Sequence, residues 1–276
     1  MEFLEILKAI FIGIVEGITE WLPVSSTGHM ILVDEFLSLK MSDEFRELFL
    51  VVIQLGAILA VPILFFDRLY PFSKKKTEED KKATLSLWLK IIVGVLPAVV
   101  IGFLLDDFFD EHFYNFVTVA IALIVYGIAF IVVEKCNKNK TARIESVYDI
   151  SYRDALIIGS FQVLSLIPGT SRSGSTILGG MLNGVSRTAA SEFSFFMAIP
   201  VMVGASLLKI AKFFLDGNTA SGGEIGLLAI GMAVSFAVSL LAIKFLMNFV
   251  KKHSFSAFGI YRIVLGAVVL GYFIFA

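Results

Sequence analysis

Six stretches of predominantly apolar residues, each close to the length that crosses a lipid bilayer, constrain this chain most strongly. A helix needs about 20 such residues to span the hydrocarbon core. The chain of 276 residues is 57% hydrophobic and 17% charged, whereas a soluble domain carries roughly a quarter charged residues. The sequence therefore predicts an all-α integral membrane protein. The expected spans are residues 48–66, 88–105, 116–133, 193–215, 225–248 and 259–276.

Two further apolar regions are each interrupted by a proline and a polar run. Residues 3–33 contain Pro23, and residues 155–185 contain Pro168. Backbone that leaves the helix at membrane depth is stable only where it is buried in protein or lines a wet cavity. We therefore expect each region to form a re-entrant hairpin, in which a helix enters, a polar turn follows and a second helix leaves.

Lysine and arginine in the loops predict the orientation of the spans, because cytoplasmic loops are enriched in both residues. Segments 73–82 and 134–143 are rich in them and are expected in the cytoplasm. Segments 106–112 and 216–224 contain neither residue and are expected outside. This pattern places both chain termini outside, with the first hairpin entering from outside and the second from the cytoplasm.

Each half of the chain then holds one hairpin and three spans, and because three is odd the halves have opposite orientation. We predict a single membrane domain, 1–276, built from two inverted-topology repeats, 1–135 and 150–276. Inverted repeats with broken helices usually place their site near the membrane midplane, where the repeats meet. The two polar turns are therefore expected to lie together.

A shift of the sequence by 146 residues supports the duplication. It places Ser25 on Ser171 and sets Glu16 against Gln162, a carboxylate against its amide. Some matches of common apolar residues are chance, but serines and glycines that frame both turns are less easily explained in that way.

The first polar turn lies in EGITEWLPVSSTGH, residues 16–29. Glu16 and Glu20 are four residues apart, so on a helix they share a face at about 6 Å separation. Each charge at mid-bilayer costs about 2.5–3.5 kcal/mol, and two like charges repel. A divalent metal or Arg172 would offset that cost. The alternative is a helix end that is exposed to water near the membrane surface.

Hydroxyl and imidazole groups follow the two glutamates directly. Ser26 is a candidate nucleophile, and a hydroxyl nucleophile needs a neighbouring base, which His29 or Glu20 would provide. The alternative is that Ser25 or Ser26 serves as the N-cap of the outgoing helix.

The second polar turn, PGTSRSGST at 168–176, has the composition of a phosphate cradle. Its glycines allow backbone N–H groups to converge on an anion, and Arg172 supplies a planar fork suited to phosphate oxygens. An apolar helix is expected from Ile177, and its N-terminus favours negative charge. The alternative is a flexible turn with Arg172 extended to the membrane interface. The proposed anion-binding residues are Gly169, Thr170, Ser171, Arg172, Ser173, Gly174, Ser175 and Thr176.

Other features carry less information. Gln54 is polar within the first span, and either reaches the site or makes a hydrogen bond between packed helices. A net charge of −1 gives no sign of a nucleic-acid partner, and the single cysteine, Cys136, excludes an internal disulfide. The sequence leaves open whether two copies form a homodimer.

The signatures E-x-x-x-E and P-G-x-S-R-S-x-x-T, with ASEFSFFMAIP downstream, resemble the undecaprenyl-diphosphate phosphatase family of the bacitracin-resistance type. The resemblance covers essentially the whole chain. It implies hydrolysis of a C55 isoprenyl diphosphate to the monophosphate carrier lipid of cell-envelope synthesis. It also implies a divalent metal ion (Mg²⁺ or Ca²⁺) and a site that opens to the outer side of the bacterial plasma membrane. The family's site residues correspond here to Glu16, Glu20, Ser26, His29, Ser171, Arg172, Ser173 and Thr176.

Roles follow as hypotheses. Arg172 holds the diphosphate, Ser26 or His29 attacks the terminal phosphorus unless water attacks directly, and Glu16 and Glu20 bind the metal or position water. The partners are then the isoprenyl diphosphate substrate and membrane lipid. A different class of function fits the same architecture, because a lipid-phosphate flippase or an ion-coupled transporter would use the same midplane residues.

Overall fold

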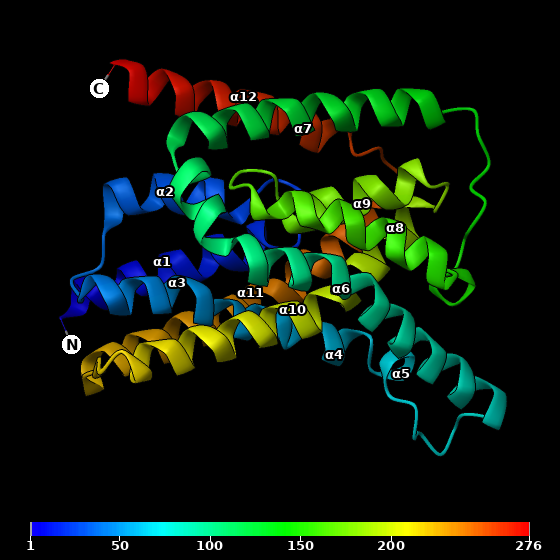
Figure 1. Cartoon of the computed structure of the whole chain (residues 1–276), viewed down its shortest axis with the longest axis horizontal. Helices are drawn as coiled ribbons and strands as arrows, with labels where there is room; N and C mark the ends of the chain where they lie inside the picture. Colours follow the sequence, from blue (N-terminus) through cyan, green and yellow to red (C-terminus); the bar gives the residue numbers. More distant parts are fainter. Residues whose placement is uncertain (1, 276) are drawn as a thin grey trace.

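The computed structural model describes residues 2–275, apart from the side chains of residues 106, 107 and 110. This part of the chain folds into helices joined by turns (Figure 1). The helices are α1 (Phe3–Thr19), α2 (Ser26–Leu37), α3 (Asp43–Ile58), α4 (Ala60–Leu64), α5 (Phe66–Leu69), α6 (Glu78–Phe113), α7 (Phe116–Asn137), α8 (Tyr152–Val163), α9 (Arg172–Leu182), α10 (Arg187–Leu215), α11 (Gly222–Val250) and α12 (Ser256–Phe275), with 3-10 turns η1 (Val147–Asp149) and η2 (Leu164–Leu166).

Six helical segments of the described chain are long and apolar enough to cross a membrane, which confirms the number of spans predicted from the sequence. They are Asp43–Leu64, Glu78–Leu105, Phe116–Asn137, Arg187–Leu215, Gly222–Val250 and Ser256–Phe275. An all-α architecture with several membrane-spanning helices is therefore the fold class of this protein.

The bounds of several spans differ from those expected. α3 and α10 begin five or six residues before their apolar stretches. Ser42 accepts a hydrogen bond from the Phe45 N–H at 3.2 Å, and Ser186 accepts one from the Ala189 N–H at 3.2 Å. Capping serines thus determine where these helices start, whereas hydropathy reports only the part that lipid surrounds.

The expectation that residues 106–112 form a loop is wrong, because α6 continues to Phe113. This acidic stretch contains no glycine or proline that would end a helix. Three of its side chains, at positions 106, 107 and 110, lie outside the described atoms, and the side of the membrane that the stretch faces stays a prediction.

Both polar regions form a helix, a turn and a second helix, as expected. α1 and α2 flank the first turn, and α8 and α9 flank the second. Among the described residues other than glycine, only Ser25 and Ser171 have a positive φ, at 72° and 75°. The Oγ of each serine accepts a hydrogen bond from the glycine N–H three residues later, at 3.2 and 3.1 Å. The two turns therefore share a backbone conformation and a cap.

The two hairpins lie in the middle of the molecule, between the pair α7–α12 on one side and α3, α10 and α11 on the other (Figure 1). α1 packs on α11, and α8 packs on α6. Small residues bring these backbones close together: a Cβ on Gly13 would lie 2.8 Å from the Gly231 carbonyl oxygen, and one on Gly159 would lie 1.8 Å from that of Gly94. The long helices thus hold both hairpins without room for movement at these contacts.

At its N-terminus, α8 is fixed by a buried carboxylate. Asp154 and Ser151 form a capping box, and Asp154 also accepts hydrogen bonds from Arg143 (2.5 Å) and Asn183 (2.8 Å). Burial raises the pKa of Asp154, but these hydrogen bonds outweigh burial and hold the pKa well below its usual range. The ionised carboxylate therefore ties α8 to the loops that precede α8 and follow α9.

Candidate active site

The two polar turns meet, as the sequence predicted. Ser173, in the first turn of α9, donates its hydroxyl to the main-chain oxygens of Glu20 at 3.1 Å and Leu22 at 3.4 Å. Trp21 is fully buried and packs edge-on against Phe195 of α10, with ring centroids 5.2 Å apart. The turn after α1 is therefore a packed structure, and not a water-exposed helix end.

Glu20 lies at the centre of the contacts between the halves. Its Oε1 forms a salt bridge with Arg172 Nη2 at 2.8 Å, and its Oε2 accepts a hydrogen bond from Ser26 Oγ, also at 2.8 Å. Both Glu20 and Arg172 have little exposed surface. Arg172, one of the two groups expected to offset a buried glutamate charge, thus pairs with Glu20 and does not extend to the membrane interface.

Ser194 of α10 is a site residue that the sequence reasoning missed. Arg172 Nη1 donates to the Ser194 carbonyl oxygen at 2.9 Å, and the hydroxyls of Thr176 and Ser194 lie 2.7 Å apart. A serine within an apolar helix usually indicates a packing contact between helices. The only sequence signal for a site role was the position of Ser194 within the motif ASEFSFFMAIP. Ser194 therefore holds Nη1 of the guanidinium, while Glu20 holds Nη2.

Glu16 is buried on α1, with 1% of its surface exposed, and its Oε1 has no hydrogen-bond partner in the described structure. The described residues contain no group of three or more His, Cys, Asp or Glu side chains that could hold a metal ion. Mg²⁺, however, is commonly bound by one or two carboxylates together with substrate phosphates and water. A buried carboxylate oxygen without a partner fits that type of site.

His29 faces α12, and no hydrogen bond among the described residues joins its ring to Ser26. Its Nδ1 lies 2.7 Å from the Ser25 carbonyl oxygen, and its Nε2 lies 2.7 Å from the Tyr261 hydroxyl. The two rings are nearly parallel, with centroids 5.7 Å apart. In a neutral imidazole, Nδ1–H donates to the carbonyl and Nε2 accepts from Tyr261. Tyr261 is a second residue that the sequence reasoning missed.

The remaining residues predicted to bind the diphosphate already have structural contacts. Gly169 has a φ of +90°, and a Cβ there would lie 2.6 Å from the Val119 carbonyl oxygen, so this position requires glycine. Ser171 caps α9 through the Gly174 N–H, and Thr170 is buried. α9 begins at Arg172, five residues earlier than expected. Gln54 is half-buried on α3, and no hydrogen bond among the described residues joins it to the site.

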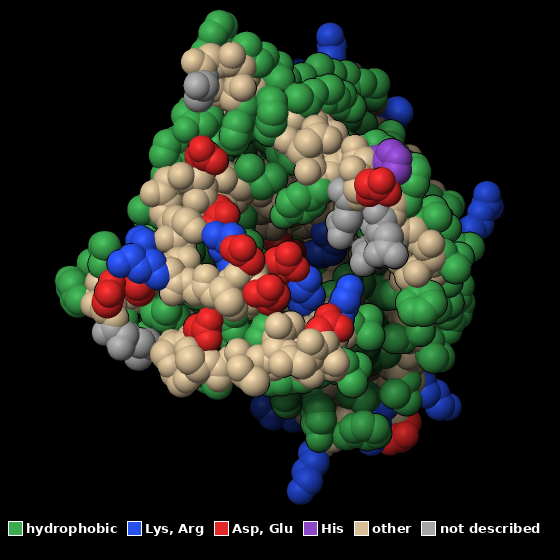
Figure 2. Space-filling model, turned by 60° about the vertical axis from the view of Figure 1, so that its left-hand side comes forward, with side chains coloured by type: hydrophobic (Ala, Val, Ile, Leu, Met, Phe, Trp, Pro, Cys, Tyr) green, Lys and Arg blue, Asp and Glu red, His purple; other side chains and the backbone are tan. Residues whose placement is uncertain are grey.

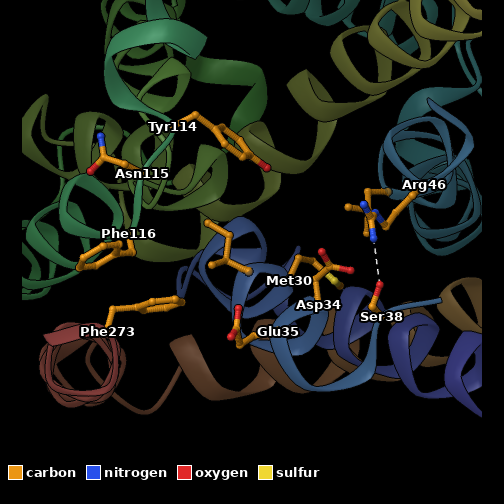
Figure 3. A pocket seen from close by; sticks show the side chains of 11 residues that line it. Met30, Asp34, Glu35, Ser38, Arg46, Tyr114, Asn115, Phe116 and Phe273 are labelled. Carbon is orange, nitrogen blue, oxygen red and sulfur yellow. Dashed lines mark hydrogen bonds between the residues drawn. The ribbon is translucent and has the colours of Figure 1, made fainter. Parts of the chain in front are cut away.

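A cavity of about 450 Å³ lies beside the part of α2 that follows the site residues Ser26 and His29 (Figure 3). Met30 and Asp34 follow Ser26 at four-residue intervals on α2, Ser38 is the C-cap residue directly after the helix, and all three line the cavity. Arg46 of α3 lies across from them and donates to Ser38 Oγ at 2.9 Å. Charged side chains of both signs gather around a hollow at this end of the molecule (Figure 2). The helix face that carries Ser26 therefore leads to an open, charged end.

Comparison with known proteins gives the family. The model of the bacitracin resistance protein BacA family matches residues 9–268. The chain belongs to this family. It is 59% identical to a curated undecaprenyl-diphosphatase of Enterococcus faecalis over 276 residues, which is the whole of both chains. It is 58% identical over 271 residues to one from Acetivibrio thermocellus and 54% identical over 270 residues to one from Lactiplantibacillus plantarum, with 98% of each chain covered.

Proposed function

We propose that this BacA-family protein hydrolyses undecaprenyl diphosphate to undecaprenyl phosphate and inorganic phosphate in the bacterial plasma membrane. The observation that carries the proposal is the chain of contacts Ser26–Glu20–Arg172, which joins a hydroxyl, a carboxylate and a phosphate-binding cation across two turns. The relatives' names support the substrate, and the six apolar helices support the membrane location.

In this proposal Glu20 is the general base. The Ser26 hydroxyl already donates to Glu20 Oε2, so the proton moves to the carboxylate as Ser26 Oγ bonds to the terminal phosphorus. The bond between that phosphorus and the bridging oxygen breaks, and the lipid monophosphate leaves. Water then hydrolyses the phosphoserine, and the proton on Glu20 is released. The alternative, direct attack by water that Glu20 activates, uses the same contacts.

Arg172 is proposed to hold the diphosphate and to stabilise the charge on the transferred phosphoryl oxygens. Ser194 and Glu20 orient its guanidinium before substrate arrives. Glu16 would hold a divalent ion together with substrate oxygens, and this ion would neutralise charge on the diphosphate. His29 is a weaker candidate nucleophile than Ser26, because Tyr261 and the Ser25 carbonyl engage both of its nitrogens.

We further propose that the chain consists of two inverted repeats with re-entrant hairpins, and that the site opens to the outer side. The matching turns at Ser25 and Ser171 support this arrangement. The helix packing supports it too. α1 packs on α11 and α8 packs on α6, and in the proposed repeats α8 is the equivalent of α1 and α6 is the equivalent of α11. The cavity beyond Met30 is the proposed path for the polar headgroup and for phosphate. Labelling of single cysteines at positions 35 and 75 with an impermeant thiol reagent, in a Cys136→Ser background, tests the orientation: residue 35 should react from outside and residue 75 from inside.

Purified protein in detergent tests the function. Release of phosphate from undecaprenyl diphosphate, lost in Ser26→Ala and dependent on a divalent ion, is the expected result. Rapid quenching with substrate labelled in the terminal phosphate should trap phosphoserine in the wild type. Turnover without any trapped phosphoprotein would favour direct attack by water. A protein that bound the lipid but released no phosphate in detergent would instead point to a flippase or transporter, which requires two compartments to show activity.

A further inference from the structure

Arg262 is a fully buried arginine on α12, with 0% of its surface exposed. An arginine has five N–H donors and no acceptor. In the described structure its guanidinium donates only to main-chain carbonyl oxygens. These belong to Pro23 (3.1 Å), Gly169 (2.8 Å), Thr170 (2.9 Å), Ala122 (3.4 Å) and Leu123 (3.4 Å).

Three of these acceptors belong to the two polar turns. Nη1 donates to Pro23 in the first turn, and Nη2 donates to Gly169 and Thr170 in the second. Because the guanidinium is a rigid planar fork, it fixes the separation of the groups that its two ends bind. One side chain from the last helix thus bridges both turns and sets their spacing.

The bridge lies directly behind the catalytic contacts. Pro23 is three residues from both Glu20 and Ser26, and Thr170 is two residues before Arg172. A Cβ on Gly174 would lie 3.2 Å from Arg262 Nη1, so the guanidinium also lies against the first turn of α9. The neighbouring Tyr261 contacts His29 from the same helix. α12 therefore supports both halves of the site.

Stability alone does not explain a buried arginine at this position. Burying a cation is costly unless it is paired with an anion. The groups around Arg262 are carbonyl dipoles and the face of Tyr126, whose ring centroid lies 5.6 Å from Cζ. An apolar residue of similar volume often packs at least as well as a buried charge. What an apolar residue cannot do is hold two separate turns through directed hydrogen bonds.

We propose that Arg262 is a positioning residue, which sets the spacing of the two turns so that Ser26 and Glu20 are aligned with the phosphoryl group that Arg172 holds. The inference rests on the proposed function. Arg262 acts through the turns and does not contact the substrate. Its loss should therefore lower kcat and leave the affinity for the diphosphate largely unchanged, because a misplacement of about 1 Å costs roughly 100-fold in rate.

Arg262→Lys is the informative variant, because lysine keeps the charge but lacks the fork. Phosphate release by the purified full-length protein gives the rate. A non-hydrolysable isoprenyl methylenediphosphonate gives both the number of intact sites and their affinity. We expect kcat per binding site to fall about 30- to 100-fold, with the analogue's Kd within about threefold of the wild type. A merely structural role would reduce the number of sites and leave kcat per site unchanged.

Two other arginine-to-lysine variants serve as controls for Arg262→Lys. Arg187→Lys alters an arginine that is only partly buried and that binds Glu134 through Nε and Nη2; kcat per site should be retained. Arg172→Lys alters the proposed phosphate ligand, and the analogue's Kd should weaken at least tenfold. If Arg262→Lys behaved like Arg187→Lys, or weakened analogue binding like Arg172→Lys, the positioning role would be overturned.

Tyr126→Leu covers the case in which Arg262→Lys yields no analogue-binding protein. It removes the aromatic face over which the guanidinium lies, so that the fork is held less firmly in its orientation towards the two turns, while its carbonyl acceptors remain. We expect a three- to tenfold fall in kcat per site with unchanged Kd, and an unchanged kcat per site would contradict the proposal. Failure of the proposed function is a separate result, since the wild type itself would then release no phosphate.

Discussion

The two polar turns share the backbone conformation of one capping serine and have opposite chemistry. Ser25 and Ser171 share a positive φ and the same capping bond. Yet the first turn carries Glu16 and Glu20 where the second, 146 residues later, has Gln162 and Leu166. Ser26 of the first turn corresponds to Arg172 of the second in the same way. The same serine conformation therefore occurs in the acidic half of the site, at Ser25, and in the cationic half, at Ser171.

Glu20→Gln should give the largest effect, because it removes the carboxylate that is the proposed general base and that has no equivalent at Leu166 of the second turn. General-base catalysis contributes about 10²–10⁴-fold, and kcat for phosphate release should fall by that factor, with the protein still folded. Glu47→Gln, which alters an exposed ion pair with Lys209, is the control and should leave kcat unchanged. Near-normal turnover in Glu20→Gln would contradict the assignment of the general base to the first turn.

Arg172→Lys should follow, at about 10²-fold in kcat/KM, because lysine cannot hold Glu20, Ser194 and a phosphate oxygen in one plane. Initial rates over a range of substrate concentrations separate the two parameters, and most of the loss is expected in KM. If the loss lay only in kcat, with KM unaltered, the second turn would not be the phosphate-binding half.

Exchanging the polar residues at equivalent positions tests which of the two turns binds the metal ion. Glu16→Gln makes the first turn resemble the second, and the Mg²⁺ concentration for half-maximal activity should rise at least tenfold, because a carboxylate ligand is lost. Gln162→Glu should leave that concentration within about twofold. A metal dependence that was unchanged in Glu16→Gln would contradict the assignment of Glu16.

Ser25→Ala and Ser171→Ala test whether the two turns are equivalent in structure. Each variant removes an N-cap bond and keeps a strained positive φ, so each should lower the free energy of unfolding by about 1 kcal/mol. Ser→Gly at the same positions should cost less, since glycine adopts positive φ readily. Thermal unfolding in detergent measures both pairs, and losses that differed by more than about 1 kcal/mol would argue against equivalence.

An effect of similar size is expected at Asp154, whose corresponding position in the first hairpin is occupied by Lys8. Hydrogen bonds hold the pKa of Asp154 below its usual range. Its contribution is therefore fully present above the unfolded-state pKa of about 4 and is lost as pH falls through the lower folded-state pKa. Asp154→Asn should lower stability by about 1 kcal/mol at pH 7, and the difference from wild type should shrink in acid. A constant difference across pH would exclude the ionised carboxylate as its cause.

Much of the fold was predictable because hydropathy reports directly on which residues face lipid. The six spans, the two interrupted hairpins and the meeting of their turns followed from apolar length, prolines and loop charges. The starts of α3 and α10 did not, because Ser42 and Ser186 extend these helices through local capping bonds that hydropathy does not register. The helical end of α6 was missed because acidic residues were read as a loop.

Within the site, predictability depended on whether a residue lies in a dense polar motif or stands alone on an apolar helix. Glu20, Ser26 and Arg172 lie in dense polar motifs, and the sequence allowed Arg172 as the partner of a buried glutamate. Tyr261 and Arg262 are isolated polar residues on an apolar helix, and their partners lie more than 90 residues away. For Arg262 a signal was present, because an ionisable residue inside a span is rare and marks a functional site by default.

The bridge from Arg262 to both turns has a consequence for how the protein is made. Glu20 and Arg172 come from opposite halves, 152 positions apart, and the residue that spaces their turns belongs to the last helix. A nascent chain that has inserted only its first half holds the two carboxylates but lacks Arg172, the proposed phosphate ligand. Full activity towards the carrier lipid would thus require the final helix to have entered the membrane, and truncated chains left by stalled ribosomes would act on the lipid pool far more slowly than the complete protein.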